Sequence, residues 1–126
     1  RLDNRRGDGA GMRYVRFERL FRELLTNFPK GTVAYELVAA HKGTAAAHVY
    51  GGIVAHLTRI CEELQRPYAG IPVGTVKRHA TGKGNASKEL MVVAAARQWG
   101  IDGQHERDDN EADALWIASA LQAGLA

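Results

Sequence analysis

The alternation of apolar and polar positions predicts a chain of helices joined to short strands. Between Met12 and Phe28, apolar residues recur at helical spacing among Arg and Glu, which indicates an amphipathic helix. The run TVAYELVAA at 32–40 is apolar almost throughout and rich in β-branched and aromatic residues, as in a buried strand of a parallel sheet. A long helix is expected from Thr44 to Leu64, before Pro67.

The second half of the chain predicts one more strand and two more helices. The strand is expected around Tyr68 to Val73, followed by a basic, glycine-containing loop over 76–88. Helices are expected from Ala86 to Trp99 and again after the loop GIDGQHERD. Two strands separated by a long helix indicate a right-handed crossover and parallel pairing. Strands as apolar as 32–40 usually have neighbours on both sides, so we expect further strands outside this sequence.

Composition indicates a single globular domain over 1–126. Hydrophobic residues make up 45% of the 126 residues and charged residues 25%. Residues 1–11 are polar, rich in Arg and Gly and without apolar periodicity, so we expect a flexible segment at the start of an N-terminally incomplete domain. No apolar run approaches the about 18 residues that span a bilayer, which predicts a cytoplasmic protein without a membrane partner. The single cysteine, Cys61, is expected in the core.

Positive charge is concentrated in one stretch. The net charge is +3, and the segment VKRHATGKGNASK at 76–88 has four Lys or Arg residues and no acid. A basic loop of this kind favours a polyanionic partner held mainly by charge and therefore sensitive to salt. The segment does not follow the G-x-x-x-x-G-K-[ST] pattern, so no nucleotide cofactor is predicted.

Two acids stand in apolar surroundings. Glu36 interrupts the strand run, and Asp113 lies beyond the D-x-x-E helix-capping pattern of Asp108 and Glu111. A buried carboxylate requires a cationic partner, a proton or a metal. Each acid could pair with Arg or Lys or lie exposed at the end of its element. Together they favour a Mg²⁺ or Mn²⁺ site, and such ions activate water for phosphodiester hydrolysis.

Neighbouring residues extend these candidate sites. Asp109 and Asn110 precede Asp113 by four and three residues, so either could share its helix face and add a metal ligand. Small residues spaced by four, Ala47, Gly51 and Ala55, form a strip on the long helix. The strip suits a self-complementary helix contact in a homodimer, or packing against the chain's own sheet. His41 and Lys42 are further candidate DNA contacts.

Three blocks of sequence together resemble the RuvC-like Holliday junction resolvases, most closely those of bacteriophages and prophages. The blocks are VAYE followed by a long Ala- and Gly-rich helix, VGTVKRHATGKGNASK, and DDNEADALWIA. The resemblance implies an α/β, RNase H-like fold, in which three antiparallel strands precede two parallel ones in a mixed sheet flanked by helices. It also implies a homodimer of the bacterial or phage-infected cell that cuts branched DNA with a divalent metal, in DNA recombination and repair.

The resemblance assigns roles to individual residues. Glu36 corresponds to the strand carboxylate and Asp113 to the acid of the final helix, while Asn110 stands where the family has a third ligand. Lys77 and Lys88 correspond to the lysines that act near the scissile phosphate. The implied DNA contacts gather in the basic loop: Lys77, Arg78, His79, Lys83, Asn85 and Lys88.

The sequence departs from the family pattern at two positions, and both affect the function that we expect. The first-strand aspartate, in a GLDxG-like motif, has no counterpart, because Asp3 and Asp8 lie in a polar stretch. Ala39 stands where some relatives have an aromatic residue that contacts the junction. The sequence therefore predicts a RuvC-like crossover junction endodeoxyribonuclease whose metal site is incomplete in this fragment. The alternative is a catalytically incomplete nucleic-acid-binding module on the same fold.

Overall fold

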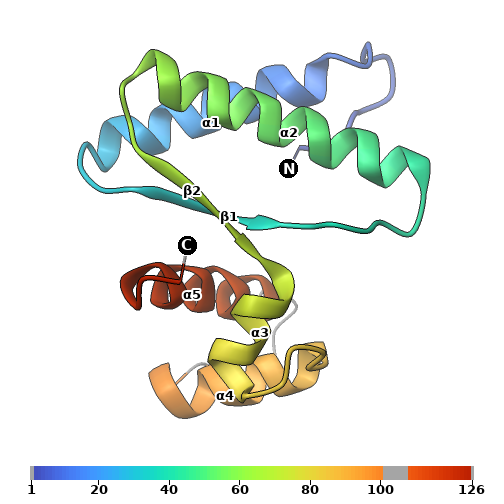
Figure 1. Cartoon of the computed structure of the whole chain (residues 1–126). Coiled ribbons are helices and arrows are strands. Elements are labelled where there is room, and N and C mark those ends of the chain that lie inside the picture. Colours follow the sequence, from blue (N-terminus) through green and yellow to red (C-terminus); the bar gives the residue numbers. More distant parts are fainter. Residues whose placement is uncertain (1, 101–107, 126) are drawn as a thin grey trace. The chain divides into compact units, whose positions relative to one another are not determined.

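The computed structural model describes residues 2–100 and 108–125, and in the last helix it describes side chains from Glu111 onward (Figure 1). The elements follow one another as α1 (Met12–Asn27), β1 (Val33–Leu37), α2 (Thr44–Glu63), β2 (Tyr68–Pro72), α3 (Val73–Thr81), α4 (Lys88–Trp99) and α5 (Asp108–Gln122). They form two compact units: Arg1–Val33 with Ala40–Tyr68, and Ala34–Ala39 with Ala69–Ala126. The prediction of a single domain over 1–126 stays a prediction.

In the first unit, α1 and α2 lie side by side and share a small core (Figure 1). Phe21 and Leu25 of α1 are buried, as are Leu57, Ile60 and Cys61 of α2. Cys61 is a free, fully buried thiol, which confirms its place in the core. Burial also raises the pKa of this thiol above its ordinary value, so the side chain behaves as a small apolar group.

Glycine allows an aromatic ring of α1 to lie directly on α2. The Tyr14 ring stacks on His56, with centroids 5.1 Å apart and planes 13° from parallel. A Cβ on Gly52 would overlap that Tyr14 ring, whereas a Cβ on the preceding residue, Gly51, would meet nothing within 4 Å. The two adjacent glycines therefore serve different purposes, and only Gly52 is required for the contact with α1.

The polar N-terminal segment makes specific contacts with α1. Arg16 forms an ion pair with Asp8 at 2.6 Å and also donates a hydrogen bond to the backbone oxygen of Asp3. The backbone N–H of Arg5 donates to the Asp8 carboxylate. Residues 1–11, which were expected to be flexible, thus include a turn that is bonded to α1 through Arg16.

In the second unit, β1 and β2 pair in a parallel, two-stranded sheet. A Cβ on Gly70 would overlap the Leu37 side chain, so a glycine is needed where the neighbouring strand passes. Within β1, the first four residues are half-buried and Leu37 is exposed. The prediction of a strand buried over 32–40 is therefore wrong in length and depth, because β2 is the one partner strand in the described chain.

A short helix replaces much of the predicted basic loop. Residues Val73–Thr81 form α3, which ends at Gly82 in the left-handed conformation (φ 84°). The loop is reduced to 82–87, and Ser87 then caps α4 by accepting a hydrogen bond from the Leu90 N–H. The helix was missed because Gly74 and the β-branched residues at 73, 75 and 76 have low helix propensity.

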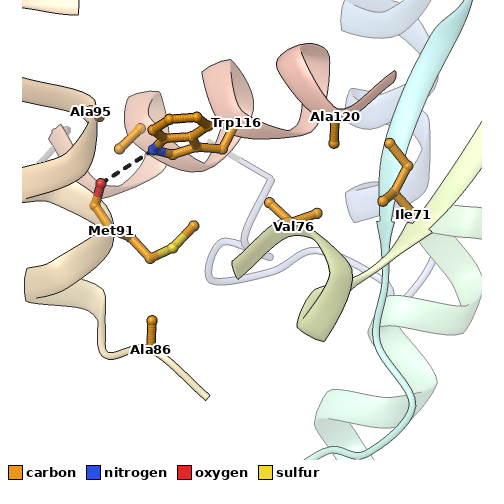
Figure 2. Packing of buried hydrophobic residues seen from close by; sticks show 8 residues of the cluster. Ile71, Val76, Ala86, Met91, Ala95, Trp116 and Ala120 are labelled. Atoms are coloured by element: carbon orange, nitrogen blue, oxygen red, sulfur yellow. Dashed lines mark hydrogen bonds between the residues drawn. The ribbon is translucent and has the colours of Figure 1, made fainter. Parts of the chain in front are cut away.

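The helices of the second unit enclose one apolar core, seen at close range in Figure 2. Its buried members come from β2, α3, α4 and α5 and from the loop before α4: Ile71, Val76, Ala86, Met91, Ala95, Ala112, Trp116 and Ala120. Ala114 and Ala118 of α5 are exposed. Small apolar residues of α5 therefore cover a surface face as well as the core.

None of the described helices is both long and apolar enough to cross a bilayer.

Candidate functional site

Four elements of the second unit converge on a pocket of about 150 Å³. Its polar lining consists of the two acids and two lysines singled out from the sequence, Glu36, Lys77, Lys88 and Asp113. Its apolar lining consists of Val73, Val76 and Met91. The structure therefore brings the four principal candidate residues into one place, although they are widely separated along the chain.

Local structure explains how each polar side chain reaches the pocket. Glu36 lies on β1, where side chains alternate between the two faces, so it points away from its neighbours Tyr35 and Leu37. Lys77 lies one helical turn after Val73 on α3. Lys88 is the first residue of α4, and its position follows from the Ser87 cap.

Asp113 reaches the pocket from α5. It follows the fully buried Ala112 and precedes the buried Trp116 by three residues. The packing of Ala112 and Trp116 in the core therefore fixes the position of Asp113 along the helix axis. The Asp113 side chain itself is half-buried. A half-buried carboxylate in an open pocket keeps access to solvent and to a ligand.

The two carboxylates affect each other electrostatically. Burial raises the pKa of the Glu36 carboxyl above its ordinary value, and the negative charge of Asp113 raises it further. The positive charge of Lys77 opposes both effects and lowers the pKa. Two like charges held near each other in a partly desolvated pocket favour a positively charged ligand between them.

The chemistry of these side chains fits a hard divalent cation. Carboxylate oxygens are preferred by Mg²⁺ and Mn²⁺, and Mg²⁺ commonly takes only one or two protein carboxylates while keeping several waters. No three His, Cys, Asp or Glu residues cluster within the parts of the chain that the structure describes. The side chains of Asp108, Asp109 and Asn110 lie outside the described residues, so the predicted cap and the two additional ligands stay predictions.

The other predicted DNA contacts of this stretch lie at the end of α3 and in the loop 82–87. Arg78, Lys83 and Asn85 are exposed there, as is Lys88. A Cβ on Gly84 would lie 3.0 Å from the Arg78 Nη2, so the guanidinium group rests against the glycine. Thr81 stabilises the bend by donating to the Lys77 carbonyl at 2.9 Å and accepting from the Lys83 N–H at 3.1 Å.

His79 has a different environment from these basic residues. Its Nε2 lies 2.9 Å from the hydroxyl oxygen of Ser119 on α5, and its ring contacts Trp116 edge-on. His79 is half-buried, and its predicted contact with DNA stays a prediction. The role of Ser119 was missed, because a serine in an Ala-rich helix gives no signal until α3 is known to lie beside it.

Other predicted site residues belong to the first unit. The His41 ring lies 4.9 Å from that of Tyr50, and Lys42 is exposed. In the small-residue strip, Ala47 is half-buried, whereas Gly51 and Ala55 are exposed. Most of the strip therefore faces outward and remains available for a helix from another molecule.

The apolar wall of the pocket could not be recognised from the sequence. Val73 and Val76 were assigned to a strand end and a loop, and only a helix brings them to the same side as Lys77. Met91 was not singled out from the sequence, and it is both a buried core residue of α4 and part of the pocket wall.

Comparison with protein-family models and with curated proteins gives no match. Among solved structures, Thermus thermophilus RuvC is similar over 98% of this chain and 76% of its own, with a TM-score of 0.76 and 20% identity. The structure of T. thermophilus RuvC in complex with a Holliday junction substrate is similar over 97% and 74%, with a TM-score of 0.79 and 20% identity. The chain thus has a RuvC-like α/β fold.

Proposed function

We propose that this chain is a metal-dependent, structure-selective DNA endonuclease on an RNase H-like fold of the RuvC type. The observation that carries the proposal is the convergence of Glu36, Asp113, Lys77 and Lys88 on one pocket in a chain with a RuvC-like fold. Fold alone does not imply activity, so the site carries the functional argument.

The pocket residues divide into two groups by charge. Glu36 and Asp113 would hold a Mg²⁺ or Mn²⁺ ion, which when bound supplies an activated water and neutralises charge on the phosphodiester. Lys77 and Lys88 donate hydrogen bonds to phosphate oxygens and counter the negative charge that grows during hydrolysis. Val73, Val76 and Met91 reduce the water in the pocket, which strengthens these electrostatic interactions.

Branched DNA is the proposed substrate. Support comes from the similar RuvC structure that contains a Holliday junction and from the exposed basic residues beside the pocket. Arg78, Lys83 and Lys88 can follow the phosphate backbone on the side of the pocket where the loop 82–87 lies. Binding of this kind weakens steeply as salt concentration rises, because it releases counterions from the DNA.

The nuclease proposal is tested on this chain and on a version extended by any residues encoded before Arg1, because the family's first-strand aspartate has no counterpart in this sequence. Each is incubated with a fluorescently labelled four-way junction and Mg²⁺ or Mn²⁺, and the extended version is the one expected to cut. We expect divalent-metal-dependent cleavage that falls by about a hundred-fold or more in Asp113→Asn, because the variant loses a charge that faces the phosphate site. Glu111→Gln is the matched control, since Glu111 is an exposed acid on the same helix. Equal cleavage by Asp113→Asn and the unmodified chain would contradict the mechanism.

The same assay evaluates the alternative of a DNA-binding module without activity. Its support is that only two carboxylates meet in the pocket among the described side chains. Tight, salt-sensitive junction binding without cleavage in either metal would favour this alternative. Lys83→Ala should then reduce the slope of log affinity against log salt by about one, whereas Lys30→Ala, at an exposed lysine after α1, should leave it unchanged.

A further inference from the structure

Two side-chain contacts connect the three helices that line the pocket, α3, α4 and α5. Trp116 of α5 donates its indole N–H to the backbone oxygen of Met91 on α4, at 3.4 Å, as Figure 2 shows. His79 of α3 lies 2.9 Å from the Ser119 hydroxyl of α5 and places its ring edge-on to Trp116, with centroids 5.6 Å apart. The first contact joins α4 to α5, and the second joins α3 to α5.

Each contact lies within one helical turn of a pocket residue. His79 follows Lys77 by two residues on α3, and Met91 follows Lys88 by three on α4. On α5, Trp116 follows Asp113 by three residues, and Ser119 follows it by six, about 9 Å further along the same continuous helix. A helix is rigid over one turn of 5.4 Å, so a shift of the contact moves the pocket residue by a similar amount.

The contact between His79 and Ser119 is a directional contact that joins α3 to α5. Around it, α3 and α5 otherwise meet through apolar groups such as Val76, Ala112 and Ala120, which pack without a directional preference. A hydrogen bond depends on both distance and angle, and it therefore selects one register of the two helices. Lys77 and Asp113 are the pocket residues on these two helices.

We propose that His79 and Ser119 are positioning residues that set Lys77 and Asp113 in the register required for cleavage. The expected effect on cleavage rests on the proposed nuclease function. The alignment of α3 against α5 can be measured whether or not the protein cuts DNA. His79 then acts through Lys77 rather than by touching DNA, which distinguishes it from Arg78 and Lys83 in the same basic stretch.

Three variants of the full chain test this inference: Ser119→Ala, His79→Leu and His79→Gln. The first two remove the hydrogen bond, while the Gln amide in the third can still bond to the serine hydroxyl. His48→Leu is the matched control, because His48 is an exposed histidine of the first unit. Thermal unfolding of each variant identifies any that fails to fold, and Ser119→Ala is small enough to preserve the helix.

Two measurements are made on each variant. Backbone amide signals of Lys77 and Asp113 in ¹H–¹⁵N NMR spectra report the register without any requirement for activity. Single-turnover cleavage of a labelled junction and its Kd separate chemistry from binding. We expect Ser119→Ala and His79→Leu to move both amide signals and to slow cleavage by about ten-fold to a hundred-fold, with Kd nearly unchanged. His79→Gln should retain most of the rate.

The outcomes separate failure of this inference from failure of the nuclease proposal. Unmoved Lys77 and Asp113 signals in Ser119→Ala would overturn the positioning role. A weaker Kd in His79→Leu with a normal Ser119→Ala would show instead that His79 contacts DNA. Moved signals in a protein that cuts no junction in any form would support the register and overturn the nuclease.

Discussion

At the scale of single residues, the site depends on acids placed where apolar residues would be expected. Glu36 and Asp113 could be singled out from the sequence because each interrupts an apolar run. Their proximity could not be predicted, since it depends on how the second unit folds around the pocket. The structure adds that burial and then Asp113 raise the pKa of Glu36, so the two carboxylates oppose each other while Lys77 offsets part of the effect.

This opposition predicts how the stability of the protein depends on pH. The pKa of Glu36 is higher in the folded chain than in the unfolded chain, first through burial and then through Asp113. The stabilising effect of the protonated group is therefore complete below the ordinary pKa of glutamate and is lost as pH rises through the folded pKa. Once the pH has risen above the folded pKa, the ionised carboxylate retains its unfavourable burial and its repulsion by Asp113.

Glu36→Gln should therefore raise the melting temperature at pH 7 in metal-free buffer. The increase should shrink as pH falls to about 4, where both proteins carry a neutral side chain at this position. Melting curves of the two proteins across this range provide the measurement. The exposed Glu23 provides the control, and an equal stabilisation by Glu23→Gln would rule out the local explanation.

At the scale of elements, the sequence predicts a helix or strand correctly where the spacing of its apolar residues and the intrinsic preferences of those residues indicate the same structure. The expected bounds of α1 and α2 differ from the observed ones by a residue, because the apolar spacing and the Pro residue that follows each helix agree. For α3 the signals conflict: Gly74 and β-branched residues disfavour a helix that is stabilised by the burial of Val76. In such segments, tertiary packing determines whether a helix forms.

The adjacent glycines of α2 provide a direct test of packing at this scale. A Cβ at position 52 overlaps the Tyr14 ring, whereas a Cβ at position 51 meets open space. Both substitutions by alanine gain about the same helix propensity, so their difference isolates the steric effect. Gly52→Ala should be less stable than Gly51→Ala by about 1–3 kcal/mol in urea unfolding. Equal stabilities would show that Tyr14 moves aside without cost.

At the scale of the whole molecule, we propose that the outward strip on α2 mediates a homodimer. Exposure of Gly51 and Ala55, with open space beside the Gly51 Cα, supports close approach of a second helix. A two-fold contact would bring the same strip from each protomer together. The sequence could identify the small residues, but it left open whether they face the chain's own sheet.

The dimer is tested by analytical ultracentrifugation at about 10 μM, a concentration at which a specific dimer is populated. We expect the unmodified chain to sediment as a dimer and Gly51→Arg to sediment as a monomer, because the long charged side chain prevents close helix contact. Ala46→Arg is the control, since this exposed residue lies on another side of α2. A monomeric unmodified chain, or dissociation in both variants, would contradict the assignment.

The division into two units has a consequence for synthesis of the protein on the ribosome. All residues of the first unit have been made once Tyr68 has been added, whereas the second unit combines Ala34–Ala39 with everything after Tyr68. Glu36 is made before any residue of α2, but Asp113 completes the pocket only 77 residues later. Because domains fold as their residues emerge, the first unit can form before the pocket exists. The carboxylate site is thus a late product of translation, and a nascent chain stalled before α5 contains no complete pocket.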